Sequence, residues 1–357
     1  MLLPVIGLLT QAGDQAHADR YTYLAMIGLS LMLAWPAAEW AGTSRSRRRV
    51  LGGAAVLALL LLSVAAKKQV SHWRDNIALW SHAVECDPKD YVVHANLGNA
   101  FVTAGRMEDA ISSYQRALNL NPMLARANFS LGIAFLDMGR FQEAEDHLRR
   151  VLVVEPSKAE AHSALAYVLL RKGGLPEALS HYQAAAVIAP DAANDCNLGN
   201  ALLQSGNLPQ AVESYQRALA ANPKHADAGF GLGMAYAALG DKEAAAACYQ
   251  KVLAENPQHL PAINNLAWLL ATSTKDSIRN GAQAVALIEQ ALLLPGAGRV
   301  HLLHTLAAAY AETGQYDKAA LIALQAADMA HAQGNDALAR ELMSERPAYL
   351  SGLPRRE

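Results

Sequence analysis

Two histidines, His301 and His304, come closest in this 357-residue sequence to an arrangement that could do chemistry. Residues three apart share one face of a helix, so the pair could supply half of a zinc site. A structural zinc site needs four ligands, however, and no third ligand is evident nearby. The three cysteines, at positions 86, 196 and 248, form no CxxC pair. Unpaired cysteine packs as a small hydrophobe, so we predict structural cysteines and no metal.

Motifs that carry most enzymatic chemistry are missing from the sequence. It contains no phosphate-cradling GxxxxGK[ST], no GxSxG nucleophile turn and no HExxH zinc motif. A formal net charge of −2 leaves no basic field for a nucleic-acid backbone. We therefore predict no catalytic residue, no cofactor and no nucleic-acid partner, and we look for function in a binding surface.

Periodic prolines reveal the elements that would position such a surface. Hydrophobic residues make up 52% of the chain but aromatic residues only 6%, so the apolar content is mostly alanine and leucine, which favours an all-α fold. The helix-breaking prolines recur at intervals of 33 or 34 residues, at Pro88, Pro122, Pro156, Pro190, Pro223 and Pro257. This period resembles the tetratricopeptide repeat, a helix pair that buries its apolar faces by stacking on neighbouring pairs.

Positions between the prolines repeat as well. A Leu–Gly pair recurs in the first helix of four repeats, at 97–98, 131–132, 198–199 and 232–233, where a small residue lets the second helix approach. Glycines at 105, 139, 173, 206, 240 and 314 fall where first helices end and a positive φ is needed. We therefore predict a right-handed superhelical solenoid of tetratricopeptide repeats.

These anchors divide the chain into segments. Five regular repeats cover residues 91–259, and two degenerate repeats cover 260–333, the first of them interrupted by a polar turn at 272–281. Residues 334–357 are predicted to form a C-terminal cap and tail. Residues 67–90 contain a helix that joins the repeats to the preceding segment.

A binding surface is expected on the concave face, which the first helices of such repeats line. Asparagines recur there, and each could offer an amide donor and acceptor to a peptide backbone. Charged and aromatic side chains project to the same side and could add ion pairing and stacking. The predicted peptide-binding residues are Asn96, Asn99, Arg126, Phe129, Tyr167, Arg171, Asn197, Asn200, Asn264, Asn265 and Trp268. Asparagine near a helix start could equally be present only because it fits the consensus of the repeat.

Two apolar segments precede the repeats. Residues 21–40 are apolar up to Glu39 with aromatic residues at both ends, and residues 50–66 hold no charge over about 25 Å of helix. We predict two transmembrane helices over 21–66. Four arginines in the link 41–49 should keep it cytoplasmic, which would place the repeats on the outer side of the membrane.

The first 20 residues are harder to place. Residues 1–10 are apolar but too short to span a membrane, and a polar loop follows. We interpret residues 1–20 as the end of a membrane segment and an outer loop of a longer membrane domain. Arg20 in that loop could bind a lipid phosphate, with Asp19 orienting it, or could simply anchor the helix at the interface.

Several short segments carry a family resemblance: 18–24 (ADRYTYL), 27–29 (IGL), 73–75 (WRD), 79–80 (LW), 264–272 (NNLAWLLAT) and 279–281 (RNG). With them the chain resembles the C-terminal portion of bacterial membrane glycosyltransferase-like proteins with tetratricopeptide repeats, similar to the transmembrane O-mannosyltransferases of eukaryotes. The resemblance implies a lipid-linked sugar donor, protein acceptors and a place in the bacterial inner membrane with the repeats in the periplasm. The acidic outer loop expected to catalyse transfer in that family is absent here.

Two functions remain open from the sequence. The chain is either a membrane-tethered scaffold that binds protein or peptide partners without catalysis, or the acceptor-recognition part of a protein O-glycosyltransferase whose catalytic membrane part is missing. Assembly of a secretion or export complex through the solenoid is a third possibility of the scaffold kind.

Overall fold

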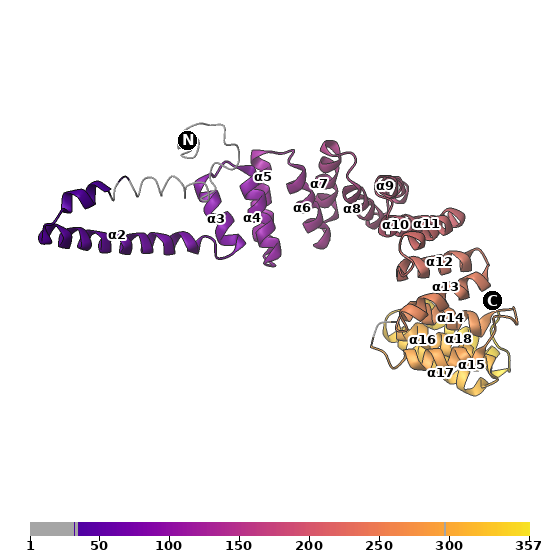
Figure 1. Cartoon of the computed structure of the whole chain (residues 1–357). Helices are drawn as coiled ribbons and strands as arrows, with labels where there is room; N and C mark the ends of the chain where they lie inside the picture. The colour runs from indigo at the N-terminus through magenta and orange to yellow at the C-terminus, as the bar shows by residue number, and fades with distance from the viewer. Residues whose placement is uncertain (1–31, 33–34, 296–297) are drawn as a thin grey trace. The chain divides into compact units, whose positions relative to one another are not determined.

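A computed structural model describes residue 32 and residues 35–295 and 298–357, and its regular elements over these ranges are all helices (Figure 1). The chain divides into two compact units, residues 1–105 and 106–357. The predicted all-α fold is confirmed within the described ranges.

The first unit contains α2 (Arg45–Ser71), α3 (Asn76–Cys86) and α4 (Tyr91–Thr103). Aspartates fix the starts of the two shorter helices: Asp75 accepts a hydrogen bond from the amide of Ala78 at 2.8 Å, and Asp90 accepts one from Val92 at 2.7 Å. Such caps satisfy amides that have no partner within the helix. Helices α3 and α4 then pack against each other.

The second predicted transmembrane helix lies in this unit and can be compared with the structure. Residues 50–66 are helical and lie within α2, but no helix in the described ranges is long and apolar enough to cross a membrane. The predicted second span is therefore not supported. Its uncharged stretch of about 25 Å falls short of the roughly 30 Å hydrocarbon core of a bilayer. Most of the first predicted span, and residues 1–20 with Asp19 and Arg20, lie outside the described residues.

The second unit is built from antiparallel helix pairs that follow one another along the chain. Its helices are α5 (Met107–Leu120), α6 (Ala125–Asp137), α7 (Phe141–Val154), α8 (Ala159–Arg171), α9 (Leu175–Ile188), α10 (Ala192–Gln204), α11 (Leu208–Ala221), α12 (Ala226–Ala238), α13 (Lys242–Glu255), α14 (Leu260–Thr272), α15 (Gly281–Ala291), α16 (Arg299–Glu312), α17 (Tyr316–Ala332) and α18 (Asp336–Leu350). First helices are the even-numbered ones from α6 to α16, and each packs on the helix that follows it.

Glycine–tyrosine contacts set the distance between the helices of a pair. A Cβ added to Gly199 would lie 2.7 Å from Cε1 of Tyr215, and one added to Gly233 would lie 2.5 Å from Cε1 of Tyr249. Real Cβ atoms do not come this close, so the ring occupies the space that glycine leaves. Between first and second helix, Gly139 adopts a φ of 72°, which favours glycine. Both roles agree with the sequence pattern.

From α14 onward the simple stacking gives way to a shared core. Buried residues of α13 to α18, including Leu266, Ile288, Leu306 and Leu342, form one hydrophobic cluster. The polar turn before α15 is fixed to this core, because the amide of Asn280 donates to the carbonyl of Leu270 at 2.9 Å. The segment expected to cap the solenoid contains a full helix, α18, which packs on α17.

Candidate peptide-binding surface

The predicted surface residues are divided between the two units. Asn96 and Asn99 lie half-buried on α4 in the first unit. The other predicted residues lie on α6, α8, α10 and α14 in the second unit.

On α6, Arg126 is exposed and Phe129 is half-buried. The ammonium of Lys158, at the start of the next first helix, lies 5.1 Å from the centre of the Phe129 ring. This distance suits a cation–π contact. The ring therefore already has a cation at one face, and Arg126 is the more accessible group of the two.

On α8, Tyr167 and Arg171 form a cation–aromatic group. They lie one helical turn apart, and Nη1 of Arg171 donates to the Tyr167 hydroxyl at 3.3 Å. The Arg171 guanidinium also lies 5.4 Å from the ring centre of Phe141 on α7. Tyr167 remains 42% exposed. A guanidinium held between two rings with one ring open to solvent can pair with a carboxylate and stack at the same time.

Three of the predicted asparagines make side-chain hydrogen bonds to other residues of the chain. Asn200 Oδ1 accepts from the Tyr215 hydroxyl at 2.7 Å, and Asn265 Nδ2 donates to the Tyr249 hydroxyl at 3.4 Å. Asn264 Oδ1 accepts from Thr305 at 2.8 Å. Buried tyrosine and threonine hydroxyls need a partner, and these amides provide it. By contrast, Asn197 is half-buried and makes no side-chain hydrogen bond with another residue that the structure describes.

The tyrosine–asparagine pairing was not predicted from the sequence. Tyr249 bonds Asn265, the sixth residue of the next first helix, α14. The sixth residue of α12, the first helix that follows Tyr215, is Gly231. A Cβ at Gly231 would lie 2.4 Å from Cζ of Tyr215, so the ring covers this glycine and its hydroxyl turns to Asn200. Burial raises the pKa of Tyr215, which therefore acts only as a neutral donor. The sequence feature that could have predicted this pairing is Gly231, which stands where α14 carries the polar Asn265.

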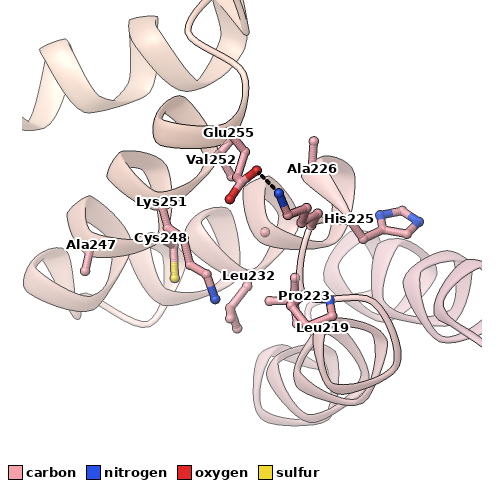
Figure 2. A pocket seen from close by; sticks show the side chains of 12 residues that line it. Leu219, Pro223, His225, Ala226, Leu232, Ala247, Cys248, Lys251, Val252 and Glu255 are labelled. Carbon is pink, nitrogen blue, oxygen red and sulfur yellow. Dashed lines mark ion pairs between the residues drawn. The ribbon is translucent and has the colours of Figure 1, made fainter.

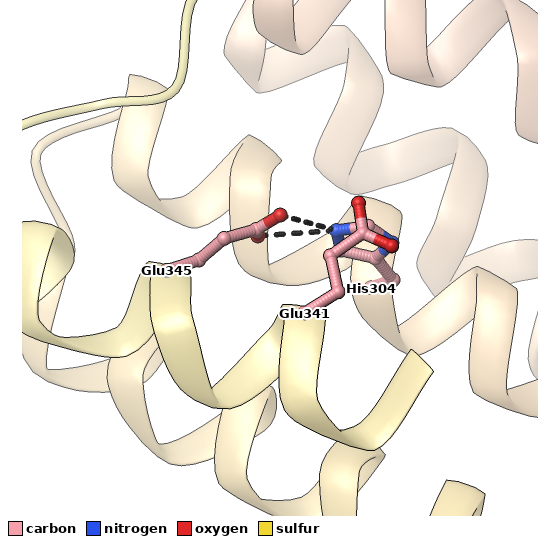
Figure 3. A group of neighbouring side chains, drawn as sticks. All are labelled: His304, Glu341 and Glu345. Carbon is pink, nitrogen blue, oxygen red and sulfur yellow. Dashed lines mark hydrogen bonds and ion pairs between the residues drawn. The ribbon is translucent and has the colours of Figure 1, made fainter. Parts of the chain in front are cut away.

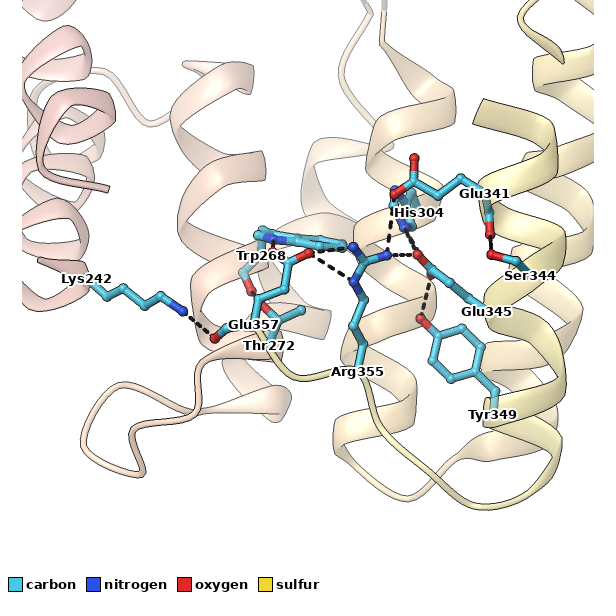
Figure 4. Close-up of polar contacts among 10 residues, drawn as sticks. All are labelled: Lys242, Trp268, Thr272, His304, Glu341, Ser344, Glu345, Tyr349, Arg355 and Glu357. Atoms are coloured by element: carbon cyan, nitrogen blue, oxygen red, sulfur yellow. Dashed lines mark hydrogen bonds and ion pairs between the residues drawn. The ribbon is translucent and has the colours of Figure 1, made fainter. Parts of the chain in front are cut away.

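Trp268, the last predicted surface residue, is covered by the end of the described chain (Figure 4). Its indole Nε1 donates to Glu357 Oε2 at 2.8 Å, and the Arg355 guanidinium lies 5.0 Å from the ring centre. His304 meets the edge of the same ring system at a centroid distance of 4.8 Å. Periodicity alone could not predict these contacts, since residues 351–357 carry no repeat position.

His304, predicted as half of an improbable zinc site, belongs to an acidic group instead. Its Nε2 lies 3.1 Å from the Glu345 carboxylate, and Glu341 lies beside them (Figure 3). His301 is exposed and is not part of this group. The Arg355 guanidinium pairs with Glu345 and lies 3.5 Å from Glu341, so a cation of the chain already lies beside the carboxylates. We assign no metal to it.

Burial and charge act together on His304. Burial first, and then the nearby Arg355 cation, lower the pKa of its imidazole below the usual value. For Glu357, burial would raise the pKa, but the Trp268 hydrogen bond and Arg355 outweigh it and lower the pKa. The neutral histidine and the ionised glutamate are therefore the forms that suit this arrangement at neutral pH.

A separate pocket of about 230 Å³ lies among the end of α11 and helices α12 and α13 (Figure 2). Leu219, Leu232 and Val252 line it, and the Lys224–Glu255 ion pair, 3.0 Å long, lies beside it. Gly229 occupies the fourth repeat position here, where other repeats carry Asn128, His162 or Asp195. Gly229 itself lines the pocket. Burial raises the pKa of the adjacent Cys248 thiol, which makes it a poor nucleophile.

Comparison with known proteins agrees with the repeat pattern. A family model described as TPR repeat matches residues 98–139, and a model described as tetratricopeptide repeat matches 129–193 and 196–259. Residues 98–259 are therefore tetratricopeptide repeats, as predicted.

One solved structure shares the fold at low identity, and two others are similar to part of the chain. A tetratricopeptide repeat protein from Parabacteroides merdae is 19% identical, with a TM-score of 0.54 over 71% of this chain and 97% of that one. YrrB, described as having an unusual peptide-binding site, is 24% identical with a TM-score of 0.48 over 52% and 95% of the two chains. MamA from Desulfovibrio magneticus is 23% identical with a TM-score of 0.45 over 47% and 96%.

A search of curated proteins found no match to this chain. The matched family models describe repeats only, and they give no support to the predicted resemblance to membrane glycosyltransferases. The sugar-transfer role, a lipid-linked sugar as partner and the lipid-phosphate role of Asp19 and Arg20 stay predictions from the sequence.

Proposed function

We propose that the chain is a scaffold that binds an extended segment of a partner protein along the first helices of its repeats. The arrangement of Tyr167, Arg171 and Phe141 carries this proposal, because it presents a pre-oriented guanidinium and an exposed ring on a rigid helix pair. Sites on regular elements hold their side chains in place better than sites on loops do. Tetratricopeptide repeats offer such a surface repeatedly.

The chemistry of the surface defines the partner segment. Arg171 would pair with an acidic side chain, Tyr167 would stack on an apolar or aromatic one, and the amide of Asn197 would bind backbone groups, which every peptide has. The neighbouring Arg126 adds a second positive group. An acidic segment with an aromatic residue is therefore the expected ligand, and recognition of an acceptor protein by a glycosyltransferase would use the same surface.

Selection of peptides from a displayed random library on the whole chain tests the proposal. Selected peptides should be acidic, and Arg171→Ala should weaken their binding about tenfold, as the loss of a charge-assisted hydrogen bond does. The matched control is Arg116→Ala, which removes an exposed arginine from the second helix α5. Equal affinity of the two variants for every selected peptide would refute the proposed surface.

We also propose that α2 associates with a membrane, which in a bacterium would be the inner membrane with the repeats in the periplasm. Support comes from Leu59, Leu60 and Leu61, which are consecutive and 61–64% exposed. Consecutive helical residues point in different directions, so apolar surface surrounds the helix. Arginines and lysines at its two ends suit anionic headgroups.

Vesicle flotation tests this second proposal. The whole chain should float with vesicles of phosphatidylglycerol, and a variant with serine at 59, 60 and 61 should remain at the bottom of the gradient. Leu239→Ser, which changes an exposed leucine of the second unit, is the control and should float like the parent. Flotation of the triple variant would show that these leucines do not insert.

A further inference from the structure

The last described residues fold back across the helices from α18 to α14 and α13 (Figure 4). We call residues 353–357 the tail. Gly352, with a φ of 75°, ends α18, and the amide of Leu353 donates to the carbonyl of Ala348 at 3.0 Å. The tail then leaves the helix as an irregular segment. It buries little apolar surface of its own, since Leu353 is 60% exposed.

Arg355 of the tail enters an acidic and aromatic recess. Its guanidinium lies 5.0 Å from the Trp268 ring centre, pairs with Glu345 and lies 3.5 Å from Glu341. Glu345 is held in place by the Tyr349 hydroxyl, which donates to it at 3.0 Å. A flat ring, a fixed carboxylate and a second carboxylate together make a receptor for a guanidinium. The Arg355 side chain remains 25% exposed.

Glu357 is bound through both its side chain and its backbone. Its carboxylate accepts from the Trp268 indole at 2.8 Å, and its amide donates to the Thr272 carbonyl at 2.9 Å. The Lys242 ammonium donates to its backbone oxygen. Between the two, Arg356 lies 2.5 Å from Glu312 on α16. Three consecutive side chains and the backbone of Glu357 are therefore contacted, as they would be in a bound peptide segment.

We propose that Trp268, Glu345, Thr272 and Lys242 form a second peptide-recognition site, in which the tail is a resident ligand that a partner segment of the same chemistry displaces. The partner is an extended segment with an arginine two residues before a glutamate. This inference rests on the proposed peptide-binding function, and it assigns to the last helices a specificity opposite in charge to that of α8.

The contacts of the tail favour exchange over permanent attachment. They are mainly ion pairs and hydrogen bonds of partly exposed groups, which contribute modestly one by one. A short tether nevertheless gives the tail an effective concentration of about a millimolar, so it would occupy the site until a tighter segment arrives. The apparent affinity for the partner equals the intrinsic affinity multiplied by the fraction of sites that the tail leaves open.

A labelled peptide with the sequence of residues 353–357, LPRRE, tests the exchange by fluorescence anisotropy on the whole chain. A variant carrying Arg355→Ala and Glu357→Ala should bind it at least about tenfold more tightly than the parent, because its own tail no longer competes. Adding Trp268→Ala or Glu345→Gln to that variant should abolish the gain. Leu353→Ala is the matched tail control and should bind like the parent.

Hydrogen–deuterium exchange on the unmodified chain provides a second test, which does not depend on whether the variants fold. Saturating LPRRE should accelerate exchange of the tail amides, Glu357 above all, while α18 stays protected. Unchanged affinity in the tail variant, or unchanged tail exchange at saturation, would overturn the inference. If selected acidic peptides still depend on Arg171, this inference alone has failed; if neither assay shows binding, the proposed function has failed with it.

Discussion

Tyr167 on α8 and Trp268 on α14 occupy the same repeat position, two residues after a buried leucine, yet their surroundings differ. Tyr167 meets a guanidinium from its own helix and stays exposed. Trp268 meets a guanidinium from the tail, and its indole is hydrogen-bonded to the tail as well. The same helix position is therefore part of an open cationic surface on α8 and of a covered acidic recess on α14. The role of a residue at this position therefore depends on the segments that cover it as well as on the type of the residue.

The largest effect should come from removing the acid that organises the recess. Glu345→Ala would leave two buried side chains, the Tyr349 hydroxyl and the His304 imidazole, without their carboxylate acceptor, and each unsatisfied buried group costs about 1–3 kcal/mol. Urea denaturation followed by circular dichroism should show that loss. Arg171→Ala, its counterpart on α8, should lower the free energy of unfolding by less than about 1 kcal/mol. Equal losses would remove the contrast between the two regions.

A middle-sized effect should separate structural from ligand-facing asparagines. Asn200→Ala leaves the buried Tyr215 hydroxyl without its acceptor, which costs about 1–3 kcal/mol. Asn197→Ala breaks no described side-chain hydrogen bond and should change stability by less than about 0.5 kcal/mol. The two unfolding midpoints should therefore differ, and coinciding midpoints would mean that Asn200 does not hold Tyr215.

For peptide binding, Asn197→Ala should have a larger effect than Asn200→Ala, the reverse of their order in stability. Asn197→Ala should weaken a selected peptide by about 1 kcal/mol, the worth of an ordinary hydrogen bond. Isothermal titration at a temperature where Asn200→Ala is fully folded measures both variants. A weaker effect of Asn197→Ala than of Asn200→Ala would contradict the assignment of the free amide as the ligand-facing one.

The smallest effect should be a pH dependence of the recess. Because the pKa of His304 is lowered in the folded chain, the unfolded chain binds protons more readily, so stability is lost as pH falls below the ordinary histidine pKa of about 6.5. Glu341, Glu357 and Arg355 act on this histidine, and Glu345 bonds it. His304→Gln should melt with a smaller drop in Tm between pH 7 and pH 5.5 than the parent, and an identical drop would contradict this.

The repeat architecture follows from the sequence because its signals are local. Proline, glycine and alanine each act within one helix pair, as the Gly199–Tyr215 contact shows, and the 34-residue period adds them up. The partners of Asn200 and Asn265 escaped prediction, since they depend on which neighbouring repeat offers a side chain and which offers Gly231. The contacts of the tail could not be predicted either, because Glu357 and Trp268 are 89 residues apart and have no periodic relation.

Photo-crosslinking tests the central claim, that a partner segment lies along the first helices, most directly. Replacing Tyr167 by p-benzoylphenylalanine in the whole chain and irradiating it with a selected acidic peptide should give a covalent adduct that mass spectrometry locates at position 167. The same photoreactive residue at Arg116, on a second helix, should give none. Adducts at position 116 and none at 167 would contradict the proposed surface.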